Sequence, residues 1–174
     1  MQHIFFTTIV SDNKENNKMT DIKQIPHYTE SIFYELKQTA RMIKFHAIQQ
    51  FTDMGIDLTP EEYSTLDTIM CNPQLCQRDL AKLLLLDRAN TGRILNKLEE
   101  KKLISRLIDT KNNRLVKKVD ITDEGVNELN SINNKIIKTY KAIAEKIPPE
   151  EFESVKTAIR NLRINLEKHI ENKI

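Results

Sequence analysis

The feature that most constrains the fold is a change of hydrophobic period in the middle of the chain. Two segments with helical spacing, at about 77–84 and 88–101, precede two β-prone runs at 104–109 and 116–121. The polar residues 110–114 between these runs include two adjacent asparagines and predict the turn of a β-hairpin. A short helix, a tight turn, a capped helix and a hairpin, in this order, predict a winged helix-turn-helix.

Long amphipathic helices are predicted on both sides of this block. Apolar residues recur every three or four positions in three stretches: 32–54, 126–147 and 152–170. This is the period of an α-helix with one buried face. A further helix begins after Thr59, which is a suitable N-cap, because Pro60 fits the first position and Glu62 completes a capping box. The predicted fold class is therefore mainly α with a small β-hairpin wing.

Positive charge gathers in the same central block. The chain of 174 residues has a formal net charge of +2, yet residues 78–121 hold twelve Lys/Arg against six Asp/Glu. A basic segment between acidic flanks indicates a face for a polyanion, although an unevenly charged solvated surface would give the same count. With 39% hydrophobic residues the chain can bury a core, and it has no apolar run of the ~20 residues that a membrane span needs.

The second helix of the block has a predicted outward face. Its inward set is Thr91, Ile94, Leu95 and Leu98. A rotation of ~100° per residue then leaves another set exposed: Ala89, Gly92, Arg93, Asn96 and Lys97. Ala89 and Gly92 would form a smooth strip that lets the helix enter a major groove, where arginine pairs with guanine and asparagine with adenine. The alternative is an exposed helix in which the glycine has no role.

Six short motifs between Leu58 and Gly125 occur in the order and spacing of a known family. They are Leu58-Thr59, Cys76-Gln77-Arg78-Asp79-Leu80-Ala81, Asp87-Arg88, Lys97-Leu98-Glu99, Leu103-Ile104-Ser105-Arg106 and Ile121-Thr122-Asp123-Glu124-Gly125. On these residues the chain resembles the MarR (multiple antibiotic resistance regulator) family of bacterial transcription factors. Outside them the resemblance is one of layout only.

Three positions depart from the pattern of that family. Lys102 stands where the family usually has glycine before the first wing strand, and Leu85 where glycine often occurs in the turn of the helix-turn-helix. Asn112 replaces an acid that would partner Arg114 in the wing. These departures concern the geometry of the turns, not the fold.

The resemblance implies a sequence-specific regulator that binds double-stranded DNA as a homodimer. Residues 1–25 would be a flexible N-terminal lead, 58–122 the winged helix-turn-helix DNA-binding domain, and 26–57 with 123–174 a helical dimerisation region. The expected target is an inverted-repeat operator, and the expected action is repression relieved by a small ligand. The alternatives are a winged helix used for protein interaction, an architectural DNA-binding module, and a cysteine redox-responsive regulator.

The predicted DNA contacts lie on both helices of the motif and on the wing. They are Arg78, Lys82, Arg88, Ala89, Asn90, Gly92, Arg93, Asn96, Lys97, Lys111 and Arg114. The basic residues at the helix ends and on the preceding helix are expected to bind phosphates. Arg114, flanked by Lys111, would enter the minor groove, whose negative potential attracts arginine; the alternative is a solvated turn residue.

The resemblance also implies a site for a small aromatic effector between the dimerisation helices and the winged domain. The candidate lining residues are Phe45, His46, Gln49 and Tyr63. An apolar pocket needs a few polar groups of this kind to orient its ligand. The alternative is that the two aromatic residues belong to the core and that His46 and Gln49 are solvated.

Cys76 is the candidate for redox sensing, because it begins a helix, where the positive helix end lowers a thiol pKa. The alternative is that it replaces a Ser or Thr cap and that Cys71 is a core thiol. Two cysteines are too few for a disulfide scaffold, so a reducing cytoplasm is the expected location. The four histidines lack metal-ligand spacing, and neither a phosphate loop nor a catalytic constellation is present. We therefore expect no metal, no cofactor and no enzymatic activity.

Overall fold

The computed structural model describes residues 27–111 and 114–171, without the side chains of 109–116. The predicted N-terminal lead at 1–25 and Asn112 lie outside the described residues. The chain divides into two compact units, residues 1–43 and 44–174. Helix α1 (Ile32–Asp53) crosses the boundary between them.

The first unit contains a short 3₁₀ helix at Tyr28–Glu30 and the first half of α1. Ser31 joins the two, because its hydroxyl donates to the carbonyl of Tyr28 (2.6 Å) and accepts from the backbone N–H of Tyr34 (3.2 Å). The rings of Tyr28 and Tyr34 meet edge to face at 5.9 Å. The regular helix therefore begins four residues later than its expected start near Tyr28.

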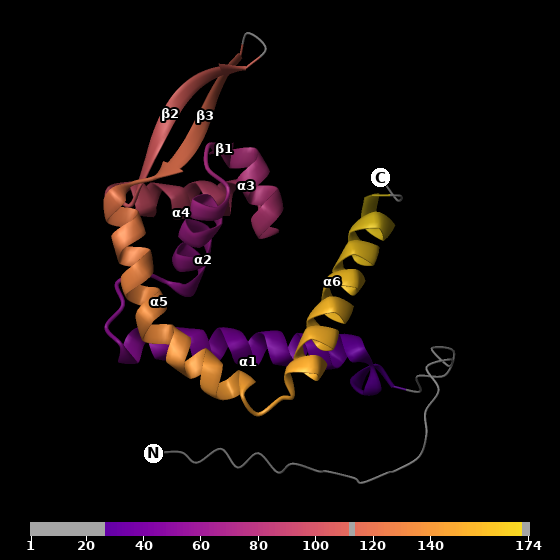
Figure 1. Ribbon diagram of the computed structural model, residues 1–174. Coiled ribbons are helices and arrows are strands. Elements are labelled where there is room, and N and C mark those ends of the chain that lie inside the picture. The colour runs from indigo at the N-terminus through magenta and orange to yellow at the C-terminus, as the bar shows by residue number, and fades with distance from the viewer. Residues whose placement is uncertain (1–26, 112–113, 172–174) are drawn as a thin grey trace. The chain divides into compact units, whose positions relative to one another are not determined.

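The second unit carries the winged helix-turn-helix. After α1 come α2 (Pro60–Cys71), β1 (Leu75–Cys76), α3 (Gln77–Leu84), α4 (Arg88–Glu100), β2 (Ile104–Lys111), β3 (Arg114–Ile121), α5 (Asp123–Ala144) and α6 (Pro149–Glu171) (Figure 1). The predicted fold class, mainly α with a small β-hairpin wing, is confirmed. The predicted order of short helix, turn, capped helix and hairpin is also found.

The wing is an antiparallel sheet of three strands in the order β1-β3-β2. The hairpin pairs Ile104 with Ile121 at its base and Lys111 with Arg114 at its far end, so the strands extend into the stretch predicted as a turn. Strand β1 was not predicted. It consists of two residues, and its register places Leu75 opposite Val119 of β3.

The core of the second unit collects the apolar faces of α2, α3, α4, α5 and β3. Its fully buried members are Leu66, Ile69, Leu80, Leu95, Leu98, Val119, Leu129 and Ile132. On α2, Leu66 and Ile69 are buried, whereas Met70, which follows Ile69 and is also apolar, is exposed. Thr65 is buried in addition, because its hydroxyl donates to the carbonyl of Glu61 (2.7 Å) and so needs no water.

Two turns keep the left-handed conformation although they lack glycine. Leu85, after α3, has φ 53°, and Lys102, after α4, has φ 61°. Both positions cost a non-glycine residue backbone strain. The departures from the family pattern thus change the residue and preserve the turn.

The backbone of Leu103 lies so close to the first turn of α5 that only glycine fits at position 125. A Cβ at this position would lie 2.1 Å from the carbonyl oxygen of Leu103. Thr122 fixes this contact, because its backbone N–H donates to the same carbonyl (3.1 Å) while its hydroxyl accepts from the N–H of Gly125 (3.0 Å). The start of α5 therefore packs directly on the strand entry of the wing.

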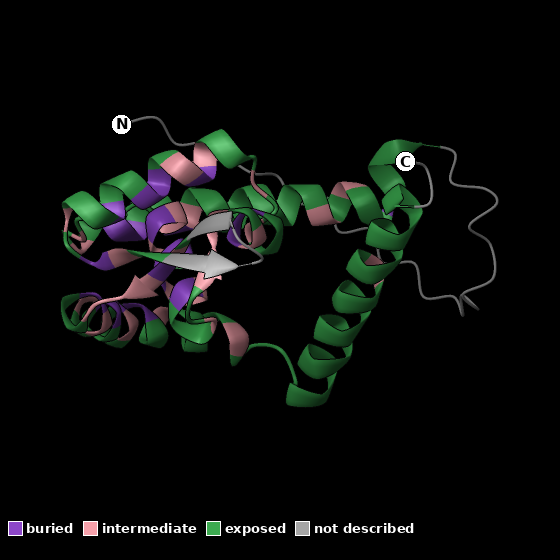
Figure 2. Cartoon of the chain, turned by 90° about the horizontal axis from the view of Figure 1, so that it is seen from above, coloured by how far each residue is buried: buried purple, intermediate pink, exposed green. Residues whose placement is uncertain are grey.

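Helix α6 has an apolar stripe that is largely exposed among the described residues. Phe152, Val155, Ile159, Leu166 and Ile170 are exposed, and the sixth member of the stripe, Leu162, is half-buried. Figure 2 shows α6 almost entirely in the exposed colour, whereas buried residues gather in the helices and strands of the core.

Candidate nucleic-acid interface

The two helices of the motif are held together by contacts at the start of α4. Asp87 caps α4, accepting from the N–H of Asn90 at 2.7 Å. Gln77 of α3 donates its amide to the carbonyl of Arg88 (3.1 Å). A Cβ at Gly92 would lie 3.0 Å from the same amide nitrogen, so the glycine makes room for Gln77. Gly92 therefore allows α4 to pack against α3, a role in addition to the predicted one of letting the helix enter a major groove.

Helix α4 has the predicted faces. Its four buried residues are Thr91, Ile94, Leu95 and Leu98, as expected. The opposite side exposes Ala89, Arg93, Asn96 and Lys97, while Asn90 and Gly92 are half-buried. The helix therefore presents three hydrogen-bonding side chains on a rigid element with its apolar side anchored in the core.

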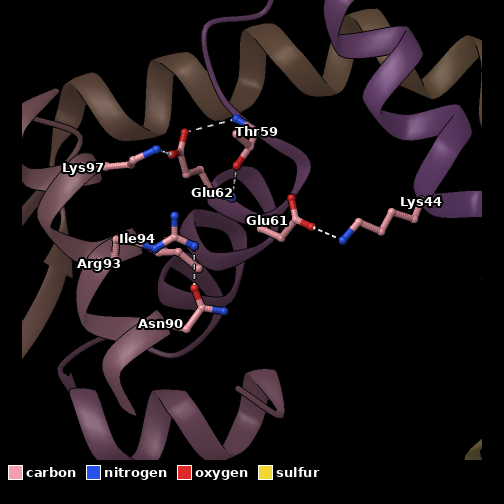
Figure 3. Close-up of a pocket in the computed structure, with 8 residues that line it drawn as sticks. All are labelled: Lys44, Thr59, Glu61, Glu62, Asn90, Arg93, Ile94 and Lys97. Atoms are coloured by element: carbon pink, nitrogen blue, oxygen red, sulfur yellow. Dashed lines mark hydrogen bonds and ion pairs between the residues drawn. The ribbon is translucent and has the colours of Figure 1, made fainter. Parts of the chain in front are cut away.

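Arg93 and Asn90 form a pair on the exposed side of α4. The guanidinium Nη2 of Arg93 donates to Oδ1 of Asn90 at 2.8 Å (Figure 3). This bond uses one of the five N–H donors of the arginine, so the remaining donors stay available for a guanine edge. Asn90 is thus the hydrogen-bond partner of Arg93, and its expected contact with DNA stays a prediction.

Lys97 is the partner of a buried carboxylate. Its Nζ lies 3.4 Å from Oε1 of Glu62, whose side chain is 5% exposed. Glu62 also completes the predicted capping box, since its other oxygen accepts from the N–H of Thr59 (3.1 Å) and Thr59 Oγ1 accepts in return (3.1 Å). Figure 3 shows both contacts at the edge of an open cavity of about 300 Å³. No sequence pattern predicts this link between α2 and α4.

A second ion pair lies beside the first. Glu61 Oε1 is 3.0 Å from Nζ of Lys44 on α1 (Figure 3). The bond from Lys44 holds the pKa of the Glu61 carboxyl below its usual value. The two neighbouring glutamates of α2 therefore neutralise one lysine each.

The other predicted phosphate contacts lie on the surface. Arg78, Lys82 and Arg88 are exposed, and Nε of Arg78 is 3.6 Å from a carboxylate oxygen of Asp79. Lys111 and Arg114 are paired at the far end of the hairpin, but their side chains lie outside the described ones. Their roles stay predictions.

Arg106 is the residue of the interface that sequence reasoning missed. It comes from β2, its Nη2 donates to Oδ1 of Asn96 (2.7 Å), and its Nε lies 3.5 Å from Oε2 of Glu99. Its place in the Leu103–Arg106 motif was visible, but only the folded structure brings it against α4.

Comparison with known proteins finds a similarity to one family. A model of the MarR family matches residues 58–116, the segment that contains α3, α4 and most of the wing. The uncharacterized HTH-type transcriptional regulator YybA of Bacillus subtilis (strain 168) is 27% identical over 137 residues, which cover 79% of this chain and 89% of that protein. The chain is similar to the MarR family over residues 58–116.

Solved structures share the fold of this chain. The transcriptional regulator SlyA matches with a TM-score of 0.70 and 23% identity, over 83% of this chain and 99% of that one. The S. aureus MepR–DNA complex matches with a TM-score of 0.66 and 23% identity, over 80% and 99%. These named relatives are transcription regulators, which supports the expectation that the chain is not an enzyme.

The four residues expected to line an effector site lie on α1 and α2. Phe45 and Gln49 are exposed, and His46 is half-buried. Tyr63 is half-buried against Phe51 and donates its hydroxyl to Oδ1 of Asn133 at 2.6 Å. Burial raises the pKa of this phenol.

Both cysteines are free thiols. Cys76 is the N-cap of α3, as expected, but it makes no capping hydrogen bond to the backbone; its thiol donates to Oδ2 of Asp79 at 3.0 Å. This bond holds the pKa of Asp79 below its usual value. Cys71 is exposed, so its interpretation as a core thiol is wrong, because the end of α2 leaves it in solvent.

Among the described residues no group of three or more His, Cys, Asp or Glu side chains is arranged to hold a metal ion. In the same part of the chain no helix has the length and apolar character to cross a membrane.

Proposed function

We propose that this chain is a transcriptional regulator of the MarR type, which binds double-stranded DNA in a sequence-specific manner through α4. The observation that carries the proposal is the exposed face of that helix, with Arg93, Asn96 and Lys97 presented together. No large apolar side chain of α4 is exposed, whereas a helix that docks on another protein would expose several. The fold shared with MepR, which is named in complex with DNA, supports the same function.

The regulator acts as a homodimer in this proposal. The apolar stripe of α6 needs a cover, and a second copy of the chain offers an identical stripe in a two-fold arrangement. Two copies of α4 would then read an inverted repeat with half-site centres about one helical turn, ~10 bp, apart. Residues 58–122 would form the DNA-binding domain and 26–57 with 123–174 the dimerisation region.

Two aspartate substitutions in the apolar stripe of α6 test the dimer. Leu162→Asp with Leu166→Asp should dissociate it, because both carboxylates would be buried in an apolar interface. The control, Asn161→Asp with Asn165→Asp, adds the same charges beside the stripe and should leave the dimer intact. Light scattering measures the mass. A leucine variant that stays dimeric and still binds DNA contradicts this arrangement.

Regulation is proposed as repression relieved by a small aromatic ligand. The ring of Phe45 is 66% exposed, and Gln49 follows one turn later on α1, so an apolar surface and a polar group lie on one side of the helix. Linkage requires such a ligand to weaken DNA binding by the same factor by which DNA weakens the ligand. Phenolic acids and peroxide are titrated against the DNA complex. Release by peroxide alone, absent in Cys76→Ser, would assign regulation to the cysteine instead.

A protection footprint on DNA upstream of the protein's own gene tests the binding function. We expect two protected half-sites related by a two-fold axis. Binding of equal strength to every duplex would indicate an architectural protein, and the absence of binding would leave the winged helix as a docking module.

A further inference from the structure

The position of Arg106 in the sheet directs it at the recognition helix. In the β2–β3 register Arg106 lies opposite Val119, and residues directly opposite each other lie on the same face of a sheet. Val119 is completely buried in the core, so this face of the wing packs on the helices. The side chain of Arg106 is only 20% exposed, although it carries a charge.

Two side chains of α4, one turn apart, hold this arginine. Nη2 of Arg106 donates to Oδ1 of Asn96 at 2.7 Å, and Nε lies 3.5 Å from Oε2 of Glu99. Nε is buried and makes no hydrogen bond of normal length among the described residues. The bond to Asn96 is therefore the main polar anchor of the guanidinium.

The contact fixes the orientation of the asparagine amide. A guanidinium only donates hydrogen bonds, so the atom of Asn96 that faces Arg106 is the oxygen, and the NH₂ group takes the other position. Within the described part of the chain no protein group accepts from this NH₂. Asn96 is exposed, and without Arg106 its side chain would sample several rotamers.

We propose that Arg106 is a positioning residue for base recognition, which holds Asn96 as a hydrogen-bond donor toward the major groove. This inference rests on the proposed DNA-binding function. With the oxygen engaged, Asn96 selects a base edge that offers an open acceptor, such as the N7 shared by adenine and guanine. It disfavours cytosine, whose major-groove edge offers an N–H donor, and thymine, whose O4 acceptor lies beside the C5-methyl group. The expected preference at this position is for a purine rather than for adenine alone.

The test measures base preference, not affinity alone. A pool of duplexes with a randomised segment of about 20 bp, enough for two half-sites, is selected by the full chain and by each variant, and the bound fraction is sequenced. Asn96→Ala and Arg106→Met should reduce the purine preference at the same base pair by about three- to tenfold, the range for one hydrogen bond. The double variant should lose no more than either single variant.

Matched variants separate positioning from charge and from stability. Lys117→Met removes one exposed positive charge from the same wing and should weaken all sequences alike without changing the preference. Arg106→Lys keeps the charge and the aliphatic stem if the methionine variant does not fold. Its one nitrogen cannot take the positions of both Nη2 and Nε, so the bond to Asn96 should weaken and the purine preference should fall here too.

The outcomes are distinct. If the wild type selects a sequence but both Arg106 variants keep the purine preference, or if Asn96→Ala does not change it, the positioning role is wrong while the proposed function stands. If the wild type enriches no sequence from the pool, both are overturned.

Discussion

Replacing Glu62 by glutamine tests how the ion pair with Lys97 competes with DNA. The glutamine oxygen still accepts from the N–H of Thr59, so the capping box remains, but Lys97 loses its anionic partner at 3.4 Å. At this distance two charges in water interact by about 1 kcal/mol, and exposed pairs are measured at about 0.2–1 kcal/mol. The water value applies because the side chain of Lys97 is 48% exposed. A phosphate that must displace Glu62 should therefore bind up to about fivefold more tightly in the variant.

The assay is fluorescence anisotropy of a labelled random-sequence duplex. Glu61→Gln is the matched control, because it removes the same charge from the same turn but releases Lys44 rather than a residue of α4. Lys97→Ala should weaken all duplexes alike and make the salt slope shallower by about one unit. In that background Glu62→Gln should have no further effect. Equal tightening by the two glutamine variants, or a Glu62→Gln effect that persists without Lys97, would refute this reasoning.

Three predictions concern stability, each measured as the free energy of unfolding in urea. Gly125→Ala should lower the free energy of unfolding by more than about 2 kcal/mol, because its Cβ would collide with the Leu103 carbonyl. The control Asn127→Ala, on the exposed side of α5, should change this free energy by less than about 0.5 kcal/mol. Similar values for the two variants would contradict the collision. Lys102→Gly should gain about 1 kcal/mol by relieving the positive φ, and Lys102→Ala, which removes the same charge, should not. Burial raises the pKa of Tyr63 in the folded protein. The contribution of Tyr63 to the free energy of unfolding is therefore complete below pH ~10 and is lost as the pH rises through the higher pKa of the folded state. Tyr63→Phe should lack this loss, and an identical pH profile in the variant would argue against this reasoning.

The faces of α4 could be predicted because local signals determine them. Asp87 is an N-cap with its own side-chain bond, and the apolar period of the following residues places Thr91 and Leu95 in the core without knowledge of the rest of the chain. The capping box at Thr59 could also be predicted from local sequence, and it is present. The family resemblance then added what the exposed face binds.

Contacts between distant segments were not predictable. Strand β1 has two residues, too few for a period, and it exists because Leu75 meets Val119 across the sheet. Arg106 is bonded to Asn96 ten residues away, and Glu62 to Lys97 through packing of α2 on α4. The stripe of α6 was readable as apolar, but the periodicity does not say what covers it.

The central claim, that α4 enters the major groove of an inverted repeat, is tested most directly by methylation interference. Methylation at guanine N7 marks the major groove, and methylation at adenine N3 marks the minor groove. We predict that N7 methylation blocks binding in two clusters about 10 bp apart, and that Arg93→Ala removes the interference at one guanine in each cluster. Interference confined to adenine N3, or an unchanged N7 pattern in Arg93→Ala, would contradict the claim.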